Sequence, residues 1–63
     1  MTYLEAYRQC KSEKELRAKV KNDVIYAYII NKDRLPRIEE AMNTVADERG
    51  WDMTGALDKR NMP

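Results

Sequence analysis

Hydrophobic positions along the chain follow helical spacing in three segments, and in one stretch they continue without a polar break. The unbroken run covers residues 24–30, with the sequence Val-Ile-Tyr-Ala-Tyr-Ile-Ile. A helical segment that is apolar on every side has to be surrounded by neighbours, and a chain of 63 residues has few neighbours to provide. The pattern therefore predicts that part of this run contacts a partner outside the chain.

Two capping boxes indicate where the first two helices begin. In each box a hydroxyl residue is followed three positions later by a glutamate, at Thr2 and Glu5 and at Ser12 and Glu15. The hydroxyl accepts a hydrogen bond from a free N–H group at the helix start, and the glutamate bonds back to the cap. These boxes predict a short first helix over residues 3–10 and a long second helix over residues 13–30.

The second predicted helix carries apolar residues on two opposite faces. One face combines five residues that we expect in the core, namely Leu16, Val20, Val24, Ala27 and Ile30. Asp23 interrupts this face with a carboxylate. The opposite face holds Ala18, Ile25 and Ile29, and Tyr28 lies between the two faces. Because a short first helix cannot cover the whole of the second face, we expect that face to be available for binding.

The third predicted helix is amphipathic and has signals at both ends. Its apolar stripe is formed by Leu35, Ile38, Met42 and Val45. Asp33 is the expected N-cap, Pro36 is tolerated in the first turn, and Gly50 suits the left-handed residue that ends a helix. Trp51 follows Gly50 directly and is expected to pack over Ala46 in the last turn.

These elements predict an all-α fold, a small three-helix domain over residues 1–51 with a flexible C-terminal tail over residues 52–63. The tail is polar, contains Gly55 and Pro63, and has three weak hydrophobic anchors, Met53, Leu57 and Met62. So few anchors do not predict a further packed element.

A buried strand is the alternative structure for residues 24–30. Valine, isoleucine and tyrosine favour strands, and a lone strand would have to pair with a second copy across a dimer. We favour the helix, because the spacing of Leu16 and Val20 continues through Val24, Ala27 and Ile30 and no second strand is evident. Both structures predict that the run needs a partner.

Composition limits the chemistry that this chain supports. It contains no histidine and one cysteine, so an internal disulfide is excluded and the commonest acid–base group is missing. Cys10 has basic neighbours that favour a thiolate, but no base accompanies it, so we interpret it as a small core residue. The acidic pairs Glu39-Glu40 and Asp47-Glu48 fall on the polar side of the third helix. We therefore expect no enzyme, no cofactor, no metal site and no small-molecule substrate.

The hydropathy of the chain also bears on its location. No N-terminal stretch resembles a secretory signal, and the longest apolar run is shorter than the roughly 20 residues of a membrane span. The single thiol suits a reducing compartment. We expect a cytoplasmic protein without a membrane partner.

Two surfaces are candidates for function. The first is a protein interface formed by Ile25, Tyr28 and Ile29, with a second copy of the chain as the expected partner. The alternative is a phosphate or nucleic-acid contact through the basic residues Lys32, Arg34 and Arg37 at the start of the third helix. Twelve basic and eleven acidic residues give a net charge of +1, which argues against a general polyanion binder.

Overall fold

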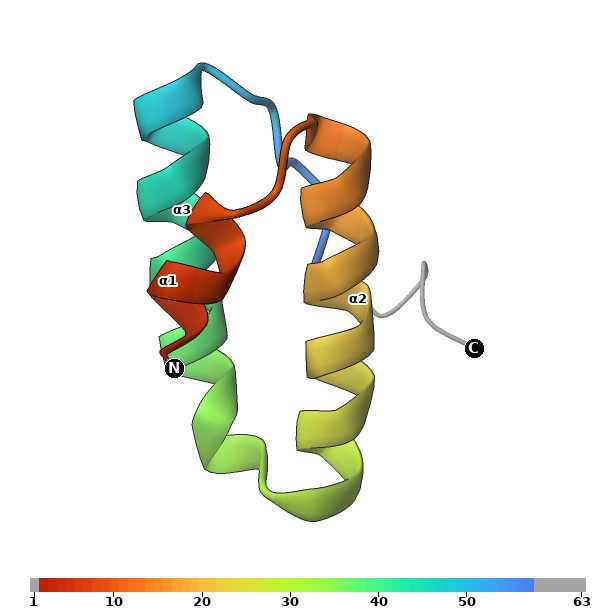
Figure 1. Cartoon of the computed structure of the whole chain (residues 1–63). Coiled ribbons are helices and arrows are strands. Elements are labelled where there is room, and N and C mark those ends of the chain that lie inside the picture. The colour runs from red at the N-terminus through yellow and green to blue at the C-terminus, as the bar shows by residue number, and fades with distance from the viewer. Residues whose placement is uncertain (1, 58–63) are drawn as a thin grey trace.

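The computed structural model describes residues 2–57, which form three α-helices and one short 3₁₀ turn (Figure 1). The elements are α1 (Tyr3–Arg8), α2 (Glu13–Ile30), η1 (Lys32–Arg34) and α3 (Leu35–Arg49). The long helices α2 and α3 run antiparallel, and α1 packs on α3. The all-α prediction is confirmed, and the strand alternative for residues 24–30 is wrong because that run lies inside α2.

Both predicted hydroxyl caps form, but among the described residues neither glutamate carboxylate bonds to the N–H group of the cap residue itself. The Glu5 N–H group donates to the Thr2 hydroxyl oxygen at 3.2 Å, and the Glu15 N–H group donates to the Ser12 hydroxyl oxygen at the same distance. The Glu15 carboxylate accepts from the Lys11 N–H group at 2.7 Å, one residue before the cap. Helix α2 therefore has the predicted bounds, whereas α1 ends at Arg8, two residues before the predicted end.

The start of α3 differs from the prediction. Asp33 does not act as the N-cap, because the Asn31 side-chain oxygen accepts a hydrogen bond from the Asp33 N–H group at 3.0 Å. Asn31 is extended, as a capping residue must be, and η1 leads from it directly into Leu35. Pro36 lies in the first turn of α3, where its missing N–H group leaves no bond unmade.

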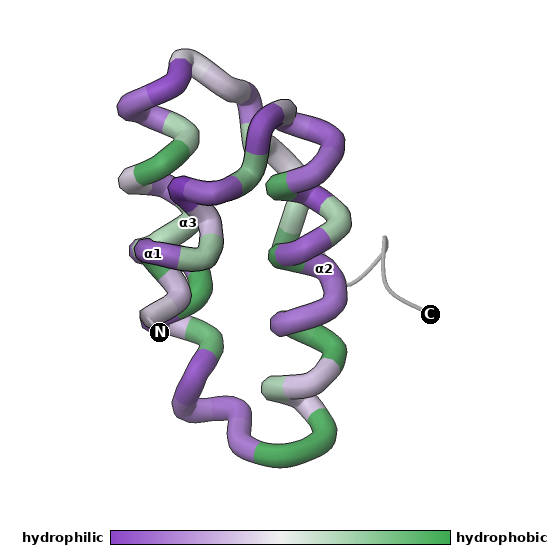
Figure 2. Tube along the Cα trace, in the orientation of Figure 1, coloured by the Kyte–Doolittle hydropathy of each residue, from purple (hydrophilic) through white to green (hydrophobic). Residues whose placement is uncertain are grey.

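The core lies between the three helices and the residues that follow them. Its largest fully buried side chains come from all three helices: Tyr7, Leu16, Val20, Val24, Ile38 and Val45. Ile30 is the exception to the predicted core face of α2, because this last residue of the helix is 55% exposed. Figure 2 shows that hydrophobic residues crowd the C-terminal end of α2, while hydrophilic residues interrupt its N-terminal half.

Polar bonds join α1 to the C-terminal end of α3. The Arg8 guanidinium forms a forked ion pair with the Glu48 carboxylate, with an N–O distance of 2.7 Å. The hydrogen bond from Arg8 lowers the pKa of Glu48. The Arg49 guanidinium donates to the carbonyl oxygens of Arg8 and Cys10, which end α1 and begin the connection to α2.

The chain turns back on itself after α3. Gly50 has a φ of 69°, and the N–H groups of Gly50 and Trp51 both donate to the Ala46 carbonyl oxygen. The Trp51 ring packs against the buried cluster that includes Ala46, as predicted. This left-handed turn sends the following residues toward α2.

The first part of the predicted tail is packed. Met53 and Ala56 are 7% and 8% exposed and belong to the core cluster. The Arg17 guanidinium on α2 donates to the carbonyl oxygens of Asp52 and Thr54, at 2.7 and 3.2 Å. The packed part of the chain therefore extends to Leu57 and does not end at Trp51 as predicted. Residues 58–63 lie outside the described part.

Candidate functional site

Three large apolar side chains on α2 are exposed to solvent. Tyr26 is 55% exposed, Ile29 is 73% exposed and Ile30 is 55% exposed. Their spacing of three and four residues makes them neighbours on the helix surface. Together with the half-buried Ile25 beside them, they form what we call the α2 apolar face. Ile25 and Ile29 lie on the side of α2 opposite Leu16, Val20 and Val24. Ile30 follows the core face in angle but is exposed at the last residue of the helix.

The predicted interface residues are only partly brought together. Ile29 is the most exposed apolar residue described, and Ile25 lies next to it. Tyr28 is half-buried and packs against the core, so it does not belong to the α2 apolar face. Tyr26 and Ile30 belong to it but were missed. The signal was present for Tyr26, since it precedes Ile29 by three residues.

The position of α1 explains why this face is uncovered. α1 packs chiefly on α3, and the chain after α3 contacts α2 at Arg17, in the N-terminal half of the helix. No described element covers the outer side of the C-terminal half. None of the described helices is long and apolar enough to cross a membrane.

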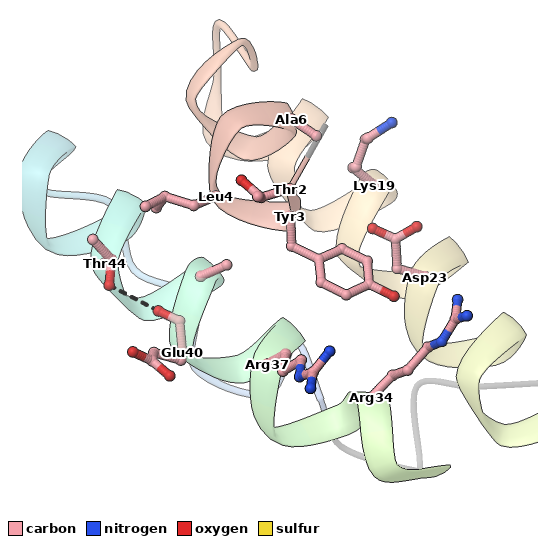
Figure 3. Close-up of a pocket in the computed structure, with 11 residues that line it drawn as sticks. Thr2, Tyr3, Leu4, Ala6, Lys19, Asp23, Arg34, Arg37, Glu40 and Thr44 are labelled. Atoms are coloured by element: carbon pink, nitrogen blue, oxygen red, sulfur yellow. Dashed lines mark hydrogen bonds between the residues drawn. The ribbon is translucent and has the colours of Figure 1, made fainter. Parts of the chain in front are cut away.

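A second candidate surface is a groove between α1, α2 and the start of α3, with a volume of about 660 Å³ (Figure 3). Its charged lining residues are Lys19, Asp23, Arg34, Arg37 and Glu40. Of the three basic residues predicted to contact phosphate, the structure brings Arg34 and Arg37 together here, whereas Lys32 does not line the groove. Lys19 is distant from these residues in the sequence, and only the fold places it in this groove.

Asp23, which interrupts the core face of α2 with a carboxylate, is paired with a buried tyrosine. The Tyr7 hydroxyl donates a hydrogen bond to the Asp23 carboxylate at 2.7 Å, so a fully buried side chain has its polar group satisfied. Burial raises the pKa of Tyr7 far above its ordinary value, and the hydrogen bond and negative charge of Asp23 raise it further. The carboxylate at the rim of the groove is therefore a structural partner of Tyr7.

We expect the stability of the fold to decline in alkaline solution because of Tyr7. The raised pKa keeps Tyr7 protonated in the folded state, while in the unfolded chain it ionises above about pH 10. The unfolded state then binds fewer protons, so the free energy of unfolding falls by about 1.4 kcal/mol per pH unit from this residue. Urea unfolding at several pH values, with the wild type and Tyr7→Phe compared, measures this slope. An equal slope in both proteins contradicts the assignment.

Cys10 and the acidic residues give no chemical site. Burial raises the pKa of the Cys10 thiol, and the nearby Glu15 charge raises it further, which opposes a reactive thiolate. Cys10 is a core residue, as the sequence interpretation held. In the described part of the chain no group of three histidine, cysteine or acidic side chains is placed to hold a metal ion.

Comparison of the chain with protein-family models, with curated proteins and with solved structures gives no match. The functional conclusion therefore rests on the two surfaces described above.

Proposed function

We propose that this chain is a non-enzymatic protein-interaction module that associates with a second copy of itself through the α2 apolar face. The supporting observation is the exposure of Tyr26, Ile29 and Ile30 at the C-terminal end of α2. Burial of this surface against an identical surface removes it from water, which is the main driving force of association. A reducing compartment such as the cytoplasm suits the free thiol of Cys10.

The size of the α2 apolar face supports a reversible dimer. At the observed exposures its three exposed side chains present about 350 Å² of apolar area, a value typical of the largest patch on a monomer. Two such faces packed against each other would bury about 700 Å² of apolar area, which is in the range of a weak interface. We therefore expect association that depends on protein concentration.

The charges at the two ends of the α2 apolar face favour a second copy in the antiparallel orientation. Lys21 is exposed one turn before Ile25, and Asp33 is exposed one turn after Ile29. In an antiparallel two-fold pair, Lys21 of one copy lies opposite Asp33 of the other, and the reverse contact forms at the other end. Such rim charges set orientation and contribute little to affinity.

Sedimentation equilibrium over a wide range of protein concentration tests the dimer. We expect the mass to rise from monomer to dimer with little dependence on salt, because burial of apolar surface drives the association. Ile29→Glu should give monomers at every concentration, since it places a charge at the centre of the α2 apolar face. Asn43→Glu adds the same charge at an exposed position on α3 and should still dimerise. A wild-type chain that stays monomeric contradicts the proposal.

The alternative of phosphate recognition remains a separate proposal. The placement of Arg34 and Arg37 in one groove favours it, but Lys32 does not take part. A nucleic-acid ligand is disfavoured because Asp23 and Glu40 line the same groove and repel a chain of phosphates.

A further inference from the structure

The arginines of the described part of the chain fall into two groups. Arg8, Arg17 and Arg49 each bond to a carboxylate or to carbonyl oxygens of their own chain. Arg34 and Arg37 make no side-chain hydrogen bond or ion pair with any described residue, and both line the groove. Among the described arginines, the two that make no such bond within the chain are therefore the two that line this groove.

The groove also contains a hydroxyl group that the fold does not use. In the view of Figure 3 the Tyr3 hydroxyl lies between the guanidinium groups of Arg34 and Arg37, and the Asp23 carboxylate lies on its other side. This hydroxyl makes no hydrogen bond with the described residues, and the ring is tilted against that of Tyr7 at 6.1 Å. The Lys19 side chain points away from this space in the same view. Two cations and one neutral donor thus share one opening with the Asp23 carboxylate, which already accepts a hydrogen bond from Tyr7.

We propose that Arg34, Arg37 and the Tyr3 hydroxyl bind the phosphate group of a small phosphate monoester. A monoester carries a charge of about −2 at neutral pH and has three acceptor oxygens, which matches two guanidiniums and one hydroxyl. A carboxylate has one charge and two oxygens, so a single arginine fork satisfies it. The number of donors therefore favours phosphate over carboxylate.

The remaining lining residues define the rest of the ligand. Leu4, Ala41 and the Tyr3 ring give the groove an apolar wall, on which the organic part of the ester packs. Asp23 and Glu40 offset two of the three positive charges that line the groove, so the remaining positive charge favours one phosphate and not a second one beside it. The ligand is a single phosphate on an apolar or aromatic group, and a nucleic-acid strand does not fit this charge pattern.

Titration of the isotope-labelled chain with phenyl phosphate, followed by the amide signals in NMR, tests this site. At constant ionic strength and above the second pKa of phosphate, we expect saturable shifts at η1 and the start of α3. The dissociation constant should be on the order of 1 mM, since few groups contact the ligand. Inorganic phosphate should bind more weakly, because it lacks the part that packs on the apolar wall. Benzoate should bind at least about tenfold more weakly than phenyl phosphate, because it lacks the second charge.

Matched variants separate this site from general charge attraction. The double variant Arg34→Gln with Arg37→Gln should weaken phenyl phosphate binding at least about tenfold. Lys11→Gln with Lys14→Gln removes the same charge at exposed positions outside the groove and should bind as the wild type does. Tyr3→Phe, which removes one neutral donor, should weaken binding a few fold.

Three results would overturn the proposal: equal losses in the two double variants, benzoate that binds as well as phenyl phosphate, and an oligonucleotide that binds more tightly per phosphate. Ile29→Glu should leave phosphate binding unchanged, because the α2 apolar face does not line the groove. The phosphate site can therefore fail or succeed independently of the dimer.

Discussion

Replacing Leu16 by alanine is expected to remove most of the stability of the fold. Leu16 is fully buried in α2 and belongs to the core cluster that joins all three helices. The substitution removes buried apolar atoms and leaves a cavity, at a combined cost of about 3 kcal/mol or more. A domain of this size holds only about 3–5 kcal/mol of stability in total, so the loss removes most of it. Circular dichroism during urea unfolding measures the change.

Ile29→Ala is the matched control for this prediction. It removes an aliphatic side chain of the same size from the same helix, but from a position that is 73% exposed. In dilute monomeric samples its free energy of unfolding should stay within about 0.5 kcal/mol of the wild type. Equal losses of unfolding free energy in Leu16→Ala and Ile29→Ala would mean that the two faces of α2 are buried alike, which contradicts the different burial of these two residues.

Local sequence signals predicted the starts of α1 and α2 and the end of α3 because they act through neighbouring residues. The hydroxyl of Ser12 bonds to a residue three positions away, and Gly50 needs only its own backbone freedom to end α3. Asn31 shows the limit of such signals, since Asn31 and Asp33 are both good caps. The backbone geometry of the connection gave the role to the first of them.

Long-range contacts were harder to predict. Met53 and Ala56 are two apolar residues in a polar stretch, so they show no helical pattern. The left-handed turn at Gly50 nevertheless brings them to the core. Asp23 interrupts the core face of α2 in the sequence. Its carboxylate accepts a hydrogen bond from the hydroxyl of Tyr7, which lies sixteen positions earlier. A tail interaction and a buried pair of this kind depend on the packing of helices, which residue spacing alone does not specify.

In the candidate site, too, local features were predicted from the sequence and long-range contacts were not. Ile25 and Ile29 were predicted from their place opposite the core face, which is a property of one helix. Tyr28 has an angular position between the two faces, and the structure shows it half-buried against the core. The pairing of Arg34 with Arg37 was predicted from proximity in the chain, but their place in one groove with Tyr3 requires the position of α1 against α3.

Replacing Arg49 by methionine is expected to loosen the attachment of α1 to α3. The Arg49 guanidinium donates to the carbonyl oxygens of Arg8 and Cys10, which lie at and beyond the end of α1. It also lies 5.1 Å from the centre of the Trp51 ring, within the range of a cation–π contact. One side chain thus joins α1, the end of α3 and the residue that begins the packed turn. Methionine keeps most of the volume and removes every one of these polar contacts.

Arg49→Met should lower the free energy of unfolding by about 1–2 kcal/mol. Charge-assisted hydrogen bonds to carbonyl oxygens contribute more than neutral ones, but those of Arg49 are partly exposed. In a domain of this size this lowers the melting temperature by roughly 5–15 °C. Lys14→Met removes a positive charge from an exposed position on α2 and should lower it by far less. Hydrogen exchange distinguishes the mechanism: amide groups of α1 should exchange faster in Arg49→Met while those in the middle of α2 stay protected. Uniform acceleration in all three helices would show that Arg49 stabilises the fold as a whole and that α1 has no separate attachment there.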